Sequence, residues 1–283
     1  MLTAYSTSFL LLCLSASQVS AYPQVQARQQ ASSTTEAFIP VVTPYVWNES
    51  ATSGWRIHAS CNSTERAQLL FAFKETEKLA KHAKDHILFH GASSDFYQTY
   101  FGAAKTGEPI GWYEKILNGD KGEMLWRCDD VDDRCSDTER AGYNREESHF
   151  EEAVTCQYSY HTRMPLTQLC AFGYTVANSE DNTVYFASDI MHRIFHMPGF
   201  GENLTLDHYA DGWENSTKLA KEDPSKAVRN SATLRLFALD VYAYDIAVPG
   251  IGCTGNTTIS HDHASETASA PKASQTFLQW FDI

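Results

Sequence analysis

Basic residues are scarce in this sequence. Its 283 residues include 22 lysines and arginines against 35 aspartates and glutamates, which gives a net charge of −13 at pH 7. Nucleic acid and anionic membrane surfaces are poor candidate partners, because proteins bind both through clustered positive charge. Metal cations remain candidate ligands, because the chain is acidic and carries 11 histidines.

Other common signatures are absent as well. No apolar run is long enough to span a bilayer, and there is no glycine-rich phosphate loop or Gly-x-Ser-x-Gly nucleophile motif. A short apolar run at residues 9–14 precedes small residues at 19–21. This pattern predicts a secretory signal over residues 1–21, although no lysine or arginine precedes the run. We therefore expect a secreted, extracellular or cell-wall-associated protein without a membrane span.

The cysteine content fits export. Cys13 would leave with the signal, and the even number that remains predicts three disulfides. Their pairing is open: Cys128 and Cys135 could bond to each other, or each to another partner. The remaining cysteines are Cys61, Cys128, Cys135, Cys156, Cys170 and Cys253. Five Asn-x-Ser/Thr sequons predict glycosylation at Asn48, Asn62, Asn203, Asn215 and Asn256.

Composition divides the rest of the chain into three segments. Residues 22–36 are polar and are interpreted as a disordered leader, whereas residues 37–255 form the globular body. Residues 256–283 are interpreted as a flexible tail rich in Ser, Thr and His. The apolar end of that tail, 277–283, could dock on the body or on a second chain, so oligomerisation is left open.

The body combines helical and extended patterns. Helices are predicted over 64–90, 113–118 and 232–247. Strands are predicted over 153–160, 169–177 and 183–187, with a hairpin loop at 178–182. Long helices around a small, mostly antiparallel sheet make an α+β domain.

The segment 188–199 is the most informative about function. It reads Ser-Asp-Ile-Met-His-Arg-Ile-Phe-His-Met-Pro-Gly, in which Ser188 or Asp189 can cap a helix and Pro198 ends it. His192 and His196 lie one turn apart on one face, the spacing of the two zinc ligands in the H-E-x-x-H helix. Such pairs also arise by chance as solvated residues, so spacing alone does not establish a metal site.

Arg193 stands where the peptidase motif has its glutamate. That glutamate takes a proton from zinc-bound water, whereas arginine stays protonated and has no acceptor. A cation near a divalent metal also weakens binding unless a carboxylate pairs with it or it points away. The substitution predicts a protein without efficient peptidase activity, although another carboxylate could act as the base.

Zinc needs at least one further protein ligand. His208, in the sequence Asp-His-Tyr-Ala-Asp-Gly at 207–212, is the preferred candidate because a neutral imidazole suits zinc. Asp211 is the next, either as a ligand or as a residue that orients a histidine. Glu202 is an alternative, at the third-ligand position of the longer H-E-x-x-H-x-x-G-x-x-H motif, whose glycine matches Gly199.

The remaining histidines have weaker cases. His82, His86 and His90 recur every four residues in the 64–90 helix and could collect zinc, but a solvated helix face is the favoured interpretation. In the tail, His261 and His263 are candidate accessory metal ligands or part of a polar linker.

The string His-Arg-x-x-His followed by Asp-His-Tyr-Ala-Asp-Gly resembles the fungal zincophore family, the pH-regulated antigens and a related major mould allergen. The resemblance spans residues 37–255. It implies a zincin-like metallopeptidase fold with zinc on His192, His196 and His208. It also implies a secreted or wall-associated protein that binds extracellular zinc and interacts with host surface or serum proteins and a zinc transporter. The tail departs from the family pattern, with two histidines and no cysteine.

The expected function is capture of extracellular zinc by neutral histidines, with release on acidification. One alternative is an active zinc metallopeptidase that uses a displaced carboxylate, such as Glu202 or Asp211. Another is a cell-wall or adhesion antigen in which the histidine pair binds no metal.

Overall fold

The computed structural model describes residues 54–136, 140–145, 149–177, 184–203 and 205–255. Contacts divide the chain into two units, Met1–Tyr45 and Val46–Ile283, and every described residue belongs to the second. The expected signal, leader and tail lie outside the described residues, as do Asn48, Asn256, both tail histidines and the hairpin loop. No described helix has the length and apolar character needed to cross a membrane.

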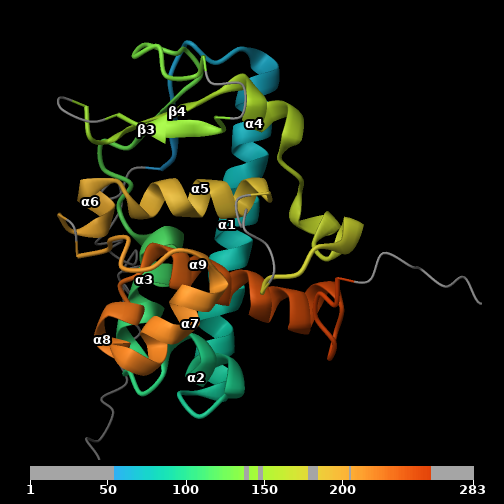
Figure 1. The fold of residues 1–283 in the computed structure, drawn as a ribbon. Helices are drawn as coiled ribbons and strands as arrows, with labels where there is room; N and C mark the ends of the chain where they lie inside the picture. The colour runs from blue at the N-terminus through green and yellow to red at the C-terminus, as the bar shows by residue number, and fades with distance from the viewer. Residues whose placement is uncertain (1–53, 137–139, 146–148, 178–183, 204, 256–283) are drawn as a thin grey trace, which may run out of the picture. The chain divides into compact units, whose positions relative to one another are not determined.

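Helices dominate the second unit, and a small sheet accompanies them (Figure 1). The α-helices are α1 (Ser63–His90), α2 (Asp95–Phe101), α3 (Gly107–Asn118), α4 (Gln157–Thr162), α5 (Phe186–Phe195), α6 (Pro198–Gly201), α7 (Gly212–Glu222), α8 (Pro224–Ala227) and α9 (Ser231–Tyr242). Shorter turns are the 3₁₀ turns η1 (Leu166–Gln168) and η2 (Ala171–Gly173) and the π turn η3 (Ala243–Ala247). The strands are β1 (Arg56–Ile57), β2 (Leu125–Arg127), β3 (Gly142–Asn144) and β4 (Glu152–Thr155).

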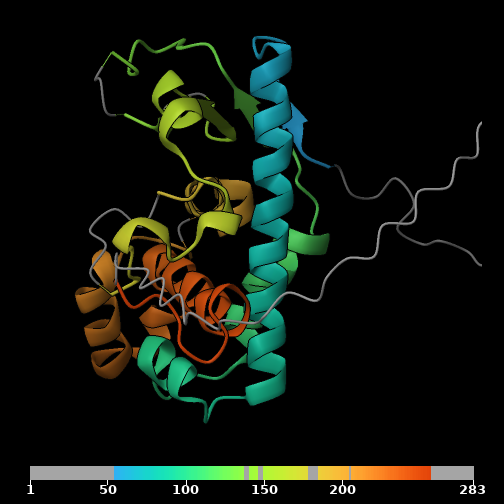
Figure 2. The same ribbon diagram turned by 90° about the vertical axis from the view of Figure 1, so that its right-hand side faces the viewer.

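α1 is the longest described element, and the prediction of a helix over 64–90 is confirmed. It begins with a capping box: the Asn62 side chain accepts from the backbone N–H groups of Thr64 and Glu65, and the Glu65 carboxylate accepts from the backbone N–H of Asn62. The helix ends at Gly91. α3, α5 and α9 pack along it, and Figures 1 and 2 show α5 crossing it part-way along.

The core lies where α1, α5 and α9 meet. Phe73 of α1, Ile190 of α5 and Phe237 of α9 are fully buried. The Thr76 hydroxyl of α1 donates to the carbonyl of Ala187 in α5 at 3.1 Å. The same hydroxyl also lies 2.8 Å from the Ala72 carbonyl within α1, so its single proton is shared between the two carbonyls and the link adds to the apolar packing of α5 on α1. The helix that carries the histidine pair is therefore packed into the core.

The sheet is small and mixed, with the strand order β1-β2-β4-β3. β1 pairs parallel with β2, β2 pairs parallel with β4, and only β3 and β4 are antiparallel. The prediction of a mostly antiparallel sheet is therefore wrong, whereas the α+β class is confirmed. α1, α2 and α3 all lie between β1 and β2, and a long crossover of this kind is what lets neighbouring strands run parallel.

Two of the predicted strands are also wrong, and the third, 153–160, is a strand only up to Thr155, because α4 begins at Gln157. Residues 169–177 contain the 3₁₀ turn η2, and Cys170 and Phe172 have φ values of 71° and 54° that break an extended run. Residues 184–187 pass from a single bridge between Met164 and Tyr185 directly into α5. Tyr174, Val176, Tyr185 and Phe186 are buried in the core as helix and turn, so their strand propensity is overridden.

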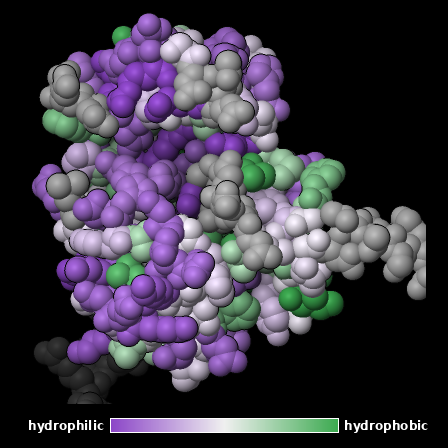
Figure 3. Space-filling view, viewed as in Figure 1, coloured by the Kyte–Doolittle hydropathy of each residue, from purple (hydrophilic) through white to green (hydrophobic). Residues whose placement is uncertain are grey.

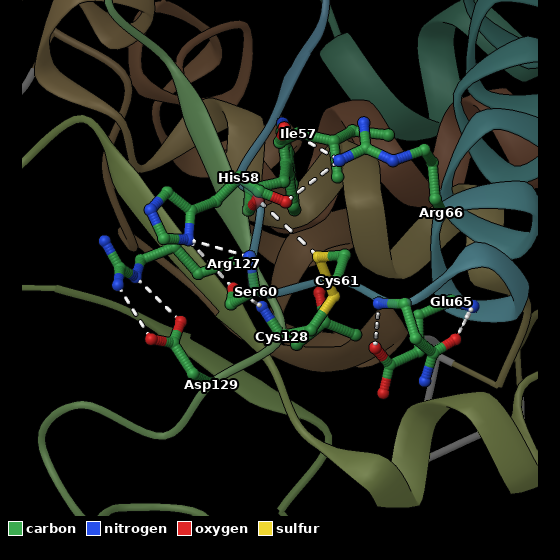
Figure 4. Close-up of a disulfide and its surroundings, with 12 residues drawn as sticks. Ile57, His58, Ser60, Cys61, Glu65, Arg66, Arg127, Cys128 and Asp129 are labelled. Atoms are coloured by element: carbon green, nitrogen blue, oxygen red, sulfur yellow. Dashed lines mark hydrogen bonds and ion pairs between the residues drawn. A yellow bond between two sulfur atoms is a disulfide. The ribbon is translucent and has the colours of Figure 1, made fainter.

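Three disulfides staple this unit, as the cysteine count predicted. They join Cys61 to Cys128, Cys135 to Cys156 and Cys170 to Cys253. Cys128 and Cys135 thus bond to different partners, not to each other. Figure 4 shows the first bond beside Arg66, whose guanidinium donates to the carbonyls of Ile57 and His58. This disulfide ties the start of α1 to the chain that follows β2.

Candidate metal centre

α5 positions the first two histidines. Ile190, Met191, Ile194 and Phe195 are fully buried in the core, which fixes how the helix is rotated about its axis. The predicted helix is confirmed, but it begins at Phe186, so neither Ser188 nor Asp189 caps it. His192 lies in the last turn, and His196 is the residue at which the helix ends.

Three histidine rings converge at this end of α5. The ring centroids of His192 and His196 lie 4.6 Å apart, and His208 brings its ring to 5.1 Å from His192 and 4.2 Å from His196. One nitrogen from each ring lies within 4.8 Å of the others. Zinc–nitrogen bonds of about 2.0–2.1 Å hold ligand nitrogens slightly closer than this. A small movement of His208, whose side chain is 39% exposed, would complete the set.

His208 reaches the pair from the loop between α6 and α7. Buried Asn230 holds this loop: its Oδ1 accepts from the backbone N–H groups of Tyr209 and Ala210 at 2.9 and 3.1 Å. Its Nδ2 donates to the Ala210 carbonyl at 2.9 Å. The backbone of Asp207 also bridges to the chain beside Asn230. Contacts far along the chain, and not the local sequence, therefore place His208.

Burial keeps the two α5 histidines neutral. Desolvation, followed by the charge of Arg235, lowers the pKa of His192 well below its usual value. Desolvation and the neighbouring His208 lower the pKa of His196 to about 4. Neutral imidazole is the form that binds metals. Nδ1 of His192 and Nε2 of His196 are buried without a hydrogen-bond partner among the described residues, and orphaned nitrogens of this kind fit metal ligation.

Arg193 is buried and paired on the sheet side of α5. Its Nη2 donates to Oδ2 of Asp189 at 2.6 Å, and its Nη1 donates to the carbonyl of Val154 in β4 at 2.8 Å. Both side chains of the ion pair are 5% exposed. The guanidinium thus has a carboxylate partner, which was the condition for tolerating a cation beside a metal. It occupies a structural position and not that of a catalytic base.

The structure separates the three candidates for the third ligand. His208 joins the pair, whereas Oδ1 of Asp211 lies 3.0 Å from Nδ1 of His208, in the position of a residue that orients a ligand. Glu202 lies beside Lys115, with Oε1 at 3.3 Å from Nζ, and is not part of the cluster. The assignment of the ligands themselves stays a prediction.

A cleft of about 760 Å³ opens at the three histidines. It lies between α5 and the β3 region, and its lining includes Tyr143, Arg163 and Phe150. Figure 3 shows a hydrophilic hollow on this face, between the sheet and α5. Solvent and small ions can therefore reach the rings directly.

Sequence reasoning missed three residues around this site. Asp189 was interpreted as a helix cap, although its spacing of four from Arg193 is a signal for an ion pair. Arg235 interrupts an apolar stretch of α9, and its charge lowers the pKa of His192. Asn230 carried no recognisable signal, because its role depends on a loop about 20 residues away.

The favoured interpretation of a solvated face on α1 is wrong for His86. His86 is buried at 5% exposure, whereas His90 is exposed. His82 and His86 both contact Asp245, which follows α9. Among the sequons, Asn62, Asn203 and Asn215 are exposed, so their glycosylation stays a prediction that the structure permits.

The sequence was also compared with known proteins. A family model described as "HRXXH: Putative peptidase family" matches residues 8–256. The chain belongs to this family. "Antigen 1" of Emericella nidulans is 46% identical over 75% of this chain and 76% of its own. "pH-regulated antigen PRA1" of Candida albicans is 42% identical over 76% and 72%, and "Major allergen Asp f 2" of Aspergillus fumigatus is 43% identical over 80% and 72%.

The HRXXH family is named for the motif that His192, Arg193 and His196 form here, so the resemblance inferred from this motif is confirmed. Among solved structures, a zinc peptidase from Grifola frondosa is similar with a TM-score of 0.46 and 19% identity, covering 64% of this chain and 97% of its own. A likeness of that size supports no conclusion about activity.

Proposed function

We propose that this HRXXH protein binds zinc outside the cell through His192, His196 and His208 and that its role is capture. The observation that carries this proposal is the convergence of three ring nitrogens within 4.8 Å at the solvent-accessible end of α5. Bound zinc would be held by lone pairs of the uncharged rings, of which the two from α5 are half-buried. Asp211 would orient His208 and increase its basicity.

The carboxylates near the site favour capture over hydrolysis. Peptide hydrolysis needs a base aimed at metal-bound water. Arg193 replaces the glutamate of the motif and is committed to Asp189 and β4. Glu202 lies against Lys115, and Asp211 is paired with His208. Each of the two candidate replacement bases therefore already has another partner, which supports the proposal that peptidase activity is weak or lost.

An extracellular location fits the same proposal. The three disulfides of the described residues are typical of oxidising compartments and not of the cytosol. Relatives that are named antigens and an allergen fit an extracellular or cell-surface protein as well. Interaction with host proteins or with a zinc transporter stays a prediction.

The test is zinc titration of the full chain by competition with a chromogenic chelator. His208→Ala removes an exposed ligand without disturbing the core, so zinc affinity at this site should fall by more than the roughly 10- to 100-fold that loss of an outer-shell partner costs. Asp211→Asn should fall within that smaller range. His161→Ala removes an exposed histidine from α4 and serves as the matched control, with no expected change.

The pH profile and an activity assay separate the alternatives. Because their pKa values are lowered, His192 and His196 stay neutral as the pH falls below the usual histidine value, so protons should compete with zinc at His196 only as the pH approaches about 4. Unchanged zinc binding in His208→Ala would contradict this site. Cleavage of casein that is sensitive to chelators and lost in His192→Ala would instead support a peptidase. Absence of bound metal after loading and dialysis would favour the adhesion antigen.

A further inference from the structure

A second set of metal-ligating side chains lies outside the cleft. His82 and His86 project from α1, and Asp245 projects from the π turn η3. Oδ2 of Asp245 lies 2.9 Å from Nε2 of His82 and 2.7 Å from Nδ1 of His86. The ligand atoms of all three residues lie within 4.8 Å of one another. This set, the α1–η3 cluster, shares no residue with the first site.

Two structural features bring these residues together: the helical spacing of the histidines and the π turn that carries Asp245. His82 and His86 are four residues apart in α1, so both rings lie on the face against which α9 packs. After Tyr242 the α9 helix widens into η3, and this π turn directs Asp245 toward the histidines. Single π turns inside helices recur at functional sites. The contact joins residues separated by 163 and 159 positions.

The surroundings of the cluster are those of a metal site. The His86 ring meets Phe96 and Phe237 in T-shaped contacts, and the His82 ring meets Tyr242 in another. This aromatic wall excludes water from one side, as apolar shells around metal sites do. On the other side, His82 and Asp245 keep 21% and 24% of their side-chain surface exposed, which leaves a route for an ion.

The nitrogen–oxygen distances in this cluster are close to the distances between the ligand atoms of a zinc ion. Ligands of a tetrahedral zinc ion with bonds of about 2.0–2.1 Å lie roughly 3.3 Å apart. The two nitrogens lie 2.9 and 2.7 Å from the carboxylate oxygen. Opening each gap by about half an ångström would admit the ion. Both nitrogens approach the same oxygen, Oδ2, so the three potential ligand atoms lie close together.

We propose that His82, His86 and Asp245 bind a second transition-metal ion, of which zinc is the best match for two imidazoles and a carboxylate. Water would fill the remaining coordination position. The ion would cross-link α1 to η3, close to the segment that leads to Cys253. This proposal does not depend on the first site, because it has its own ligands.

The experiment removes the first site and then looks for the second. In a full-length His192→Ala/His196→Ala background, zinc binding is titrated by chelator competition and thermal unfolding is followed with and without zinc. We expect one equivalent of bound zinc per chain, assigned to this cluster, and a zinc-dependent rise in Tm. Adding His82→Ala should remove both, and adding Asp245→Asn should weaken binding by at least roughly 10-fold.

Two controls make the result decisive. Asp85→Asn changes another carboxylate of α1, and His161→Ala changes an exposed histidine of α4, and neither should alter the titration. His86 is left unchanged because it is buried and its loss could disturb folding. Zinc binding that survives His82→Ala would overturn the proposal. So would a background variant that binds no zinc and loses equal stability from Asp245→Asn with and without the metal, since that result describes a hydrogen-bonded clamp only.

Discussion

At the scale of single residues, Arg193 has a structural role at the position where the peptidase motif has a catalytic glutamate. Its guanidinium donates to Asp189 and to the Val154 carbonyl of β4, so it links α5 to the sheet. Removing one member of a buried ion pair leaves the other charge uncompensated and typically costs about 3–5 kcal/mol. Arg163 also lies 3.9 Å from Asp189 and would offset part of that cost.

We therefore expect Arg193→Ala to lower the free energy of unfolding by about 3 kcal/mol, the lower end of that range. Urea unfolding followed by circular dichroism measures it. Lys81→Ala breaks an exposed pair with Asp85 at the same spacing and should cost only about 0.3–0.5 kcal/mol. Arg193→Glu, which restores the peptidase motif, should be less stable still, because it places a second carboxylate beside Asp189. Equal costs for Arg193→Ala and Lys81→Ala would refute a structural role.

At the scale of elements, the loop between α6 and α7 depends on a side chain from outside it. Asn230 satisfies the backbone N–H groups of Tyr209 and Ala210 and the Ala210 carbonyl, while its Nδ2 also donates to Thr233 at 2.8 Å. A fully bonded, buried amide of this kind is a positioning residue for His208, because it hydrogen-bonds to the loop backbone and to α9.

Asn230→Ala should therefore lower zinc affinity without removing a ligand. We expect a loss of roughly 10- to 100-fold, comparable with the loss of an outer-shell partner. Competition titration measures the loss, and hydrogen exchange at Tyr209 and Ala210 should rise in parallel. Thr217→Ala, which removes a hydroxyl of α7 that donates to the Glu214 carbonyl, is the matched control. Faster exchange with unaltered zinc affinity would show that zinc binding does not require Asn230 to fix this loop.

At the scale of the whole described unit, the disulfides enclose loops of very different length. Cys170–Cys253 spans 83 positions and encloses His192, His196 and His208, whereas Cys135–Cys156 spans 21. A cross-link stabilises mainly by restricting the unfolded chain, and the effect grows slowly with loop length.

Replacing both Cys170 and Cys253 by serine should lower the free energy of unfolding by about 4–5 kcal/mol. Replacing Cys135 and Cys156 should lower it by about 3 kcal/mol, because that loop is shorter. Urea unfolding of the two variants under non-reducing conditions gives the comparison. A smaller loss for the longer loop would mean that strain or structure in the unfolded chain, and not loop entropy, controls the effect.

The sequence by itself determined the features that depend on one segment. The helix over 64–90 with its capping box, the spacing of His192 and His196, the even cysteine count and the loss of the motif glutamate all follow from neighbouring residues, because helix period, capping and acid–base chemistry act locally.

Only the tertiary structure decided which distant groups meet. The disulfide partners and the largely parallel sheet became known only from the structure. The same holds for the pairing of Arg193 with Asp189 and for the contact of Asp211 with His208. The tertiary structure also buried His86 against Asp245, 159 positions away. Such contacts depend on how α1, α5 and α9 pack together, and the residue pattern of one segment does not identify the segment that it will contact.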